Sequence, residues 1–267
     1  MILGNRIARI RQAVPLVHCI TNYVTVNDCA NAVLAIGGSP IMSDEEKDVE
    51  DIIAICSALT LNIGTLNERT VSSMILAGKK ANELGKPVIL DPVGNGASRF
   101  RTQTTNRILE EVKVDILRGN SSEMKMVYSG VASTRGVDAS KTDADSLENQ
   151  IMMVKDLSAK LDLVVGMTGP VDVVSDGNLV YTISNGSPMM EHITGAGCML
   201  SCVVGAFAGV FENQLEATTA AIAAMGLAGD RADVPGVGTG TFRMNLIDQL
   251  SWMDDATFHA GVHIEQY

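Results

Sequence analysis

Positively charged residues are scarce in this 267-residue chain. Lys and Arg together number 20, against 31 Asp and Glu, and the net charge at neutral pH is −11. Nucleic acids and anionic membranes bind clusters of Lys and Arg, so this composition argues against both as partners. It does not argue against a small anionic ligand, because local backbone amides bind phosphate whatever the global charge.

Long apolar runs and paired cysteines are also lacking. The longest apolar stretch, from Cys198 to Phe211, is interrupted by Ser201 and is too short to span a bilayer. The first residues place Arg between apolar residues at helical spacing, without the apolar core of a signal peptide. The five cysteines are odd in number, and none forms the C-x-x-C spacing of a structural zinc site. We expect an enzyme of the reducing cytoplasm.

No Pro/Ser-rich linker, internal repeat or low-complexity segment divides the chain. With 46% hydrophobic and 19% charged residues, the composition is that of a globular protein. The length is that of one large domain or two small ones. We therefore predict a single domain over residues 1–267.

Short β-rich runs alternate with longer helical patterns over the first two thirds of the chain. Strands are predicted at 15–20, 39–42, 59–64, 86–94, 114–120 and 162–169, and helices at 26–37, 47–58, 67–85, 103–112, 146–161 and from 121 onward. Such alternation builds a mostly parallel sheet with helices on both faces, a three-layer α/β/α fold.

The pattern changes after residue 169. Asp176-Gly177 stands between two β-rich runs and is a strong signal for a two-residue hairpin. From Gly195 to about residue 260 the pattern is mostly helical. The segment 129–143 reads as one long polar loop that borders a ligand site.

Three small residues, Gly195, Ala196 and Gly197, directly precede Cys198 and the apolar run. A glycine turn that opens a helix presents unpaired backbone N–H groups and the positive end of the helix dipole. This arrangement suits an anion such as phosphate, and it places a thiol in the first turn of the helix.

Several polar residues fall where ligands bind in open α/β sheets, beyond the carboxyl ends of the strands. These are Asn22, Asp91, Arg118, Asn120, Glu123 and Thr168, and the apolar Met42 also stands at a strand end. Each also has a purely structural interpretation. Asn120 or Ser121 with Glu123 resembles a helix capping box, Asp91-Pro92 resembles a turn, and the glycines suit close helix packing. His259 and His263 have metal-ligand spacing, but no third ligand accompanies them near the chain end.

The co-occurrence of these features favours phosphoryl transfer over the structural interpretations. A carboxylate at Asp91, the N-x-x-E of residues 120–123 and the glycine turn supply magnesium carriers and a hole for developing negative charge. Arg118 adds a cation. The chain has no G-x-x-x-x-G-K-[ST], so it is not a P-loop enzyme.

With these motifs the chain resembles the ribokinase-like superfamily, and within it the hydroxyethylthiazole kinases of thiamine salvage. The resemblance extends over nearly the whole length, through HCITNYVTVNDCANAVLAIGGSPIMS, ILDPVGNGASRFR, ILRGNSSEM, GMTG and TGAGCMLS. Most ribokinase-like enzymes carry aspartate after the glycine turn, and cysteine at that place resembles the thiazole kinase branch. The acidic run MSDEEKDVED after residue 41 departs from the family pattern.

The resemblance implies a ribokinase-like fold, ATP as phosphoryl donor, Mg²⁺, and a thiazole alcohol as acceptor. It implies a catalytic base at Cys198, an anion hole formed by Gly195, Ala196 and Gly197, metal support from Asp91 and Glu123, nucleotide binding by Arg118, Thr168 and Asn120, and a thiazole pocket at Asn22, Met42 and Gly195. It also implies a homotrimer with active sites at subunit interfaces. In such a trimer we expect Asn22 and Met42 of one subunit to face Cys198 of its neighbour.

A thiol at a helix N-terminus is expected to have a lowered pKa, which suits a base. The alternatives within the fold are a kinase for a hydroxymethylpyrimidine or pyridoxal, and a dehydratase of hydrated NAD(P)H. The alternative outside it is a cysteine hydrolase, which requires a histidine such as His192 beside Cys198.

Overall fold

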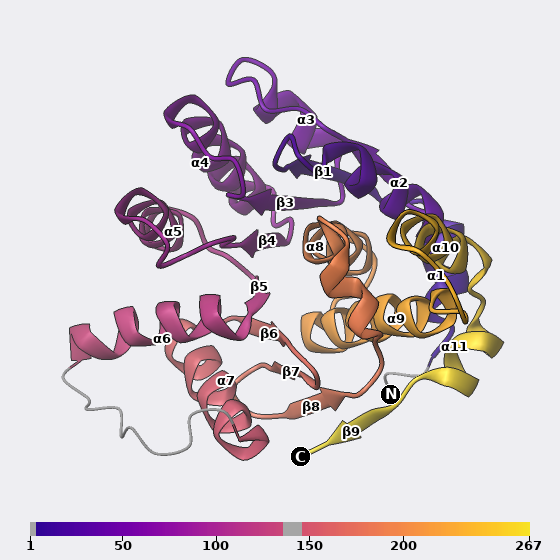
Figure 1. Ribbon diagram of the computed structural model, residues 1–267. Coiled ribbons are helices and arrows are strands. Elements are labelled where there is room, and N and C mark those ends of the chain that lie inside the picture. Colours follow the sequence, from indigo (N-terminus) through magenta and orange to yellow (C-terminus); the bar gives the residue numbers. More distant parts are fainter. Residues whose placement is uncertain (1–3, 136–145) are drawn as a thin grey trace.

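The computed structural model describes residues 4–135 and 146–267, in which nine strands form one sheet (Figure 1). The strand order across the sheet is β2-β1-β3-β4-β5-β6-β7-β8-β9. Neighbours from β2 to β6 pair in parallel, whereas β6 to β9 pair antiparallel. The bounds are β1 (Leu16–Ile20), β2 (Ser39–Ile41), β3 (Ala58–Asn62), β4 (Val88–Asp91), β5 (Ile116–Asn120), β6 (Val164–Thr168), β7 (Asp172–Ser175), β8 (Val180–Ile183) and β9 (Ile264–Gln266).

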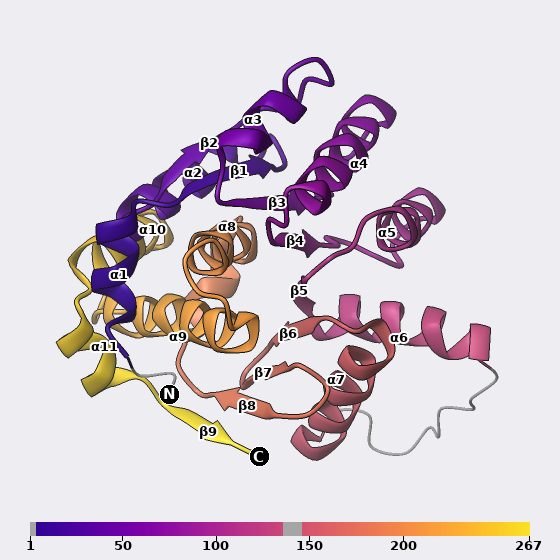
Figure 2. The same ribbon diagram turned by 180° about the vertical axis from the view of Figure 1, so that it is seen from behind.

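Helices cover both faces of the sheet (Figures 1 and 2). One layer contains α1 (Arg6–Ala13), α2 (Val26–Ile36), α8 (Ala196–Ala208), α9 (Gln214–Ala232), α10 (Thr239–Trp252) and α11 (Asp255–Gly261). The other contains α3 (Val49–Ile55), α4 (Glu68–Glu83), α5 (Arg99–Glu111), α6 (Ser121–Arg135) and α7 (Leu147–Leu161). No helix of the described ranges is long and apolar enough to cross a bilayer.

Successive residues of the strands pack alternately into two separate apolar cores, one on each face of the sheet. In β4, Ile89 packs into the core beneath α8 and α9, while Val88 and Leu90 pack into the core beneath α3 to α7. Strands that are buried on both faces require near-continuous apolar runs such as the PVIL that precedes Asp91. The predicted three-layer α/β/α architecture is confirmed.

The parallel strands end at a common edge, and their register aligns the terminal residues. Asn62 at the end of β3 pairs with Asp91 at the end of β4, and Asn120 of β5 pairs with Thr168 of β6. Since all four residues stand at the carboxyl ends of neighbouring strands, the sheet itself assembles a row of polar groups above its edge.

The structure differs from the predictions at three places outside this edge. The hairpin forms, but its loop covers four residues, 176–179, because the Asp176 carboxylate accepts the N–H groups of Asn178 and Leu179. Residues 129–135 of the predicted polar loop continue helix α6, and the remainder, 136–143, lies outside the described residues. The short strand β9 was not predicted; it pairs with β8 at the margin of the sheet.

Candidate active site

The glycine turn opens α8 in the manner that the sequence predicts. Gly195 is the N-cap residue with φ of 85°, and no side chain caps the helix. A Cβ atom added at Gly195 would lie 2.5 Å from Cγ2 of Thr25, and one added at Gly197 would lie 2.7 Å from Nη1 of Arg118. The first turn of α8 therefore approaches both α2 and β5 more closely than side chains at these positions would permit.

Cys198, in the first turn of α8, joins a hydrogen-bonded row of side chains. Nδ2 of Asn22 donates to Sγ of Cys198 at 3.2 Å and to Oδ1 of Asn62 at 3.0 Å. Nδ2 of Asn62 in turn donates to Oδ2 of Asp91 at 2.8 Å. Two amides thus connect the thiol to the carboxylate, within a single chain.

The two oxygens of Asp91 have different surroundings. Oδ2 accepts hydrogen bonds from Asn62 and, at 2.7 Å, from Oγ of Ser201, and it lies 3.7 Å from Nη1 of Arg118. Oδ1 is buried and has no hydrogen-bond partner among the described residues. Burial raises the pKa of this carboxyl to about 6; Arg118 opposes the rise and Glu123 adds to it. One acceptor of the carboxylate is therefore fully engaged and the other is free.

The expectation of a lowered pKa at Cys198 is wrong. Burial, and after it the negative charge of Asp91, raise the pKa of this thiol above its ordinary value. The dipole of a helix N-terminus contributes only a few tenths of a unit up to about one unit of pKa. At this position desolvation and a neighbouring carboxylate outweigh it.

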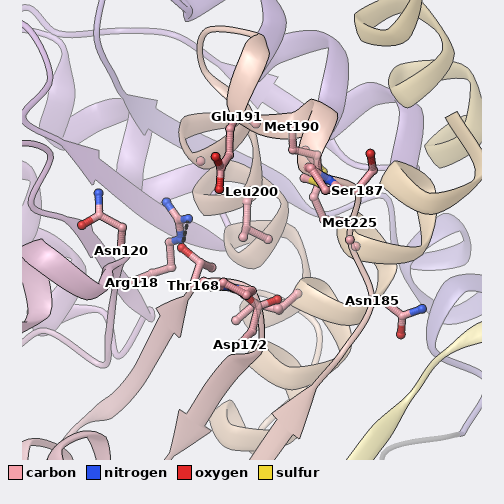
Figure 3. A pocket seen from close by; sticks show the side chains of 18 residues that line it. Arg118, Asn120, Thr168, Asp172, Asn185, Ser187, Met190, Glu191, Leu200 and Met225 are labelled. Carbon is pink, nitrogen blue, oxygen red and sulfur yellow. Dashed lines mark hydrogen bonds between the residues drawn. The ribbon is translucent and has the colours of Figure 1, made fainter. Parts of the chain in front are cut away.

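A cavity of about 400 Å³ lies next to this row, between the end of the parallel strands and α8. Its lining includes Arg118, Asn120, Thr168, Ala196 and Gly197. Figure 3 shows Arg118, Asn120 and Thr168 at one end of the cavity and Ser187, Met190 and Met225 toward the other, with Leu200 between them. The predicted nucleotide residues and most of the predicted anion hole therefore surround one space.

Arg118 is held at the polar end of this cavity. Its Nη2 donates to Oγ1 of Thr168 at 2.6 Å, the hydrogen bond drawn in Figure 3, and Thr168 donates onward to the carbonyl of Gly119. Nε of Arg118 is buried and has no partner within the described part of the chain. The guanidinium is thus fixed in direction beside the start of α8, where it faces any anion that the glycine turn binds.

Glu123 completes the capping box that the sequence suggested as an alternative. Its Oε2 accepts the N–H of Asn120 at 2.8 Å, and Oδ1 of Asn120 accepts the N–H of Glu123 at 3.0 Å. Oε1 also accepts the N–H of Gly94 at 2.8 Å, which ties the loop after β4 to α6. The structural function of Glu123 is therefore real, and any metal function is additional to it.

Three residues of the site were missed in the sequence. Asn62 and Ser201 flank Asp91, and Asp172 lines the cavity with its Oδ1 accepting the N–H of Gly169 at 3.0 Å. Burial raises the pKa of the Asp172 carboxyl to about 7. Asn62 ends a predicted strand and was detectable by the rule that found Asp91. Nothing local marked Ser201 or Asp172.

Some predicted residues are not part of this cluster. Met42 follows β2, one residue beyond the His18–Ile41 pair at the margin of the sheet, and packs against the core around α8. Asn22 was expected to face the Cys198 of a neighbouring subunit, and the structure shows it hydrogen-bonded to the Cys198 of its own chain.

The histidines take no part either. Within residues 4–135 and 146–267, no hydrogen bond connects His192 with Cys198, and no three His, Cys, Asp or Glu side chains form a metal cluster, His259 and His263 included. The acid–base partner of a cysteine hydrolase is therefore not found beside the thiol in these ranges.

Comparison with known proteins identifies relatives over nearly the whole length. The profile of the hydroxyethylthiazole kinase family matches residues 7–255. The hydroxyethylthiazole kinase of Clostridium tetani is 49% identical over 258 residues, 96% of this chain and 94% of its own. That of Clostridium beijerinckii is 50% identical over 252 residues, 93% of this chain and 91% of its own.

Solved structures show the same similarity in three dimensions. The hydroxyethylthiazole kinase protein from Pyrococcus horikoshii OT3 superposes with a TM-score of 0.91 at 35% identity, over 99% of this chain and 98% of its own. The pyridoxal kinase from Staphylococcus aureus, in complex with AMP-PCP and pyridoxal, superposes at 0.67 with 13% identity, over 95% of this chain and 99% of its own. The second similarity shows the shared ribokinase-like fold alone.

Proposed function

We propose a function for this site from one premise: the chain belongs to the hydroxyethylthiazole kinase family. The enzyme transfers the γ-phosphoryl group of ATP to the primary hydroxyl of 4-methyl-5-(2-hydroxyethyl)thiazole, yielding the thiazole phosphate and ADP, in thiamine salvage. The single observation that carries the assignment to this site is the position of Cys198. The thiol lies in the first turn of an uncapped helix and accepts a hydrogen bond from Asn22 of the Asn22–Asn62–Asp91 row. It directly follows Ala196 and Gly197, which line the same cavity as Arg118.

The cavity accommodates the nucleotide. The polar end, with Arg118, Asn120 and Thr168, receives the phosphates, and the N–H groups at the start of α8 stabilise the negative charge that develops during transfer. Met190 and Met225 at the other end, and Leu200 between the two ends, offer apolar surface to a base. Arg118 is the cation of this site, because its side chain is almost fully buried and aligned by Thr168.

Cys198 receives or orients the proton of the acceptor hydroxyl at Sγ. Because the pKa of the thiol is raised, the sulfur is largely protonated near neutral pH, and it can receive the proton only in its minority thiolate form. A loose phosphoryl-transfer transition state requires little of a base, so positioning of the hydroxyl accounts for most of the effect. Asn22 assists by donating an N–H to the sulfur, which favours the form that accepts a proton.

The residues present fit a magnesium ion. Oδ1 of Asp91 is a buried carboxylate oxygen that no described group engages, and oxygen ligands are those that Mg²⁺ selects. Asp91 would hold the ion, directly or through water, and Glu123 would support it through the lone pairs that its backbone partners leave free. When bound, Mg²⁺ neutralises charge on the phosphate oxygens. Such ions bind through one or two carboxylates plus phosphates and water, so a site without a three-residue protein cluster is normal.

Assembly into a homotrimer with active sites at the subunit interfaces is supported by apolar surface next to the site. Tyr23 and Val24, directly after Asn22, are 79% and 58% exposed, and Leu34 of α2 and Met244 of α10 are 55% and 64% exposed. A second copy that covers this surface would border the Asn22–Cys198 pair and bring Met42 to a neighbouring site. Light scattering at assay concentration measures the mass, and a fully active monomer would exclude the assembly.

The five free thiols suit a reducing compartment such as the cytoplasm.

The experiment that tests the function is ADP release from ATP and Mg²⁺, with and without the thiazole alcohol, together with identification of the phosphorylated product. We expect ADP formation that depends on the thiazole. Hydroxymethylpyrimidine and pyridoxal are the matched acceptors, because kinases for these two were the alternatives within the fold, and a pyridoxal kinase superposes on this chain. Turnover with one of these and none with the thiazole would contradict the assignment while leaving the fold intact.

A further inference from the structure

Asn62 contacts both the carboxylate side and the thiol side of the row. It is 2% exposed and stands at the end of β3, paired in register with Asp91. Its Nδ2 donates to Asp91, and its Oδ1 accepts Nδ2 of Asn22. The sequence motifs that suggest the site do not include it.

Backbone N–H groups determine which way both amides point. The N–H of Gly64 donates to Oδ1 of Asn62 at 2.9 Å, so the amide nitrogen must face Asp91. The N–H of Thr25 donates to Oδ1 of Asn22 at 3.2 Å, so the nitrogen of Asn22 must face Asn62 and Cys198. A backbone N–H can only donate, and these orientations therefore follow without reference to the side chains themselves.

Hydrogen bonds from helix α5 hold the turn that follows Asn62 in place. Arg101 of α5 donates to the carbonyls of Ile63 and Gly64 at 2.8 and 2.7 Å, and also to the carbonyl of Val93 in the loop after Asp91. A Cβ atom added at Gly64 would lie within 3.0 Å of the Asn22 side chain. The segments after β1, β3 and β4 are thus fixed relative to one another around Asn62.

We infer that Asn62 is a positioning residue, which holds Asp91 and the Asn22–Cys198 pair at the separation that phosphoryl transfer requires. The inference rests on the proposed function, because it assigns Asp91 to the phosphate side and Cys198 to the acceptor side of one reaction. Asn62 touches neither substrate in this arrangement. It acts through Asp91 on one side and through Asn22 on the other.

The test is a double-mutant cycle with three variants: Asn62→Leu, Cys198→Ala and the two combined. Asn62→Leu removes both links at similar side-chain size, and we expect it to lower kcat by about 10²-fold, the loss that a misplacement of the order of 1 Å produces. In the Cys198→Ala background the separation between Asp91 and the sulfur no longer matters, so Asn62→Leu should cost little more there. The kcat of the double variant should therefore be far higher than the value obtained by multiplying the two single losses. If Asn62→Leu merely damages the fold, its loss in kcat is independent of Cys198 and the two fold-losses multiply in the double variant. That result would overturn the inference.

Controls separate positioning from stability. The first control is Thr60→Val, two residues before Asn62 on the same strand. It removes a buried hydroxyl whose only hydrogen bond among the described residues is a 3.5 Å contact with the carbonyl of Ser201. The kcat of this variant should match that of the wild type. All five cysteines lie in the described ranges and four of them are buried, so iodoacetamide at alkaline pH should label Cys198 alone. If Asn62→Leu exposes further thiols, Asn62→Asp repeats the cycle at unchanged size, with the same criterion. Wild-type protein without thiazole-dependent ADP release would instead refute the proposed function.

Discussion

Gly197 is the position at which one methyl group should damage the site and leave the fold intact. In Gly197→Ala the added Cβ would lie 2.7 Å from Nη1, 3.2 Å from Nη2 and 3.4 Å from Cζ of Arg118. The guanidinium must therefore move by roughly 0.5–1 Å to regain ordinary van der Waals separation. It has little room to do so, since Nη2 is bonded to Thr168 and the side chain is only 8% exposed.

A displacement of this size should lower kcat/KM for ATP by roughly 10–100-fold, because misplacing a charge-stabilising group by 1 Å costs up to about 10²-fold. The effect on stability is the difference between a gain in helix propensity and a cost of overpacking. Alanine in a helix is favoured over glycine by about 0.5–1 kcal/mol, and overpacking costs about 1–3 kcal/mol. By these figures the net destabilisation is about 0–2.5 kcal/mol, which lowers Tm by at most about 10 °C for a chain of this length.

The assay is steady-state ADP release at varied ATP and varied thiazole, with Tm measured by calorimetry or circular dichroism. Gly240→Ala is the matched control, because it is an exposed helical glycine with no atom within 4 Å of the added methyl group. We expect the control to retain wild-type kinetics. A Gly197→Ala enzyme with unchanged kcat/KM for ATP would refute the assignment of Arg118 to the phosphates.

Three further predictions concern carboxylates and the thiol. Cys198→Ala should lose about 10²–10⁴-fold in kcat, because it removes both the group that positions the hydroxyl and the proton acceptor, while Cys198→Asp should remain active. A covalent adduct on Cys198 with an inactive aspartate variant would instead indicate a nucleophile. Glu123→Gln leaves one of two backbone N–H groups without an acceptor and should cost about 1–3 kcal/mol. It should also raise the Mg²⁺ concentration that gives half-maximal activity. An unchanged Mg²⁺ response would show that Glu123 caps the helix and does not support the metal. The folded-state pKa of Asp172, raised by burial to about 7 from 3.8, means that the charged carboxylate destabilises the fold. That loss of stability should develop as pH rises from about 4 to 7 and persist above. The Tm of Asp172→Asn should therefore exceed that of the wild type by an amount that grows with pH over this range. A Tm difference independent of pH would show that ionisation of Asp172 does not destabilise the fold.

Much of the site could be predicted because it follows from strand patterning. An apolar run that is buried on both faces specifies a parallel strand, and parallel strands end at one edge. Strand ends alone therefore suffice to expect Asp91, Asn120 and Thr168 together. The glycine turn before Cys198 was equally predictable, since only a turn with a positive φ and no side chains opens a helix toward an anion in this way.

The properties of these groups could not be predicted in the same way. The thiol was expected to have a lowered pKa, yet its desolvation and the proximity of Asp91 depend on how α8 packs over β4. The amide row from Cys198 through Asn22 and Asn62 joins residues that lie up to 176 positions apart in the chain. Hydrogen-bond geometry of this kind is decided by distances of a few tenths of an ångström, which no periodicity encodes.

The sequence by itself thus determined the three-layer fold, the edge at which the site lies and the residue types available there, because burial and backbone sterics act locally and repeat along the chain. Only the tertiary structure decided that Glu123 is committed to two backbone N–H groups, that Oδ1 of Asp91 is left free by the described residues, and that Asn22 meets Cys198 within one chain. Those outcomes depend on dielectric environment and on the registration of separate elements. Both are properties of the packed molecule and not of any segment of it.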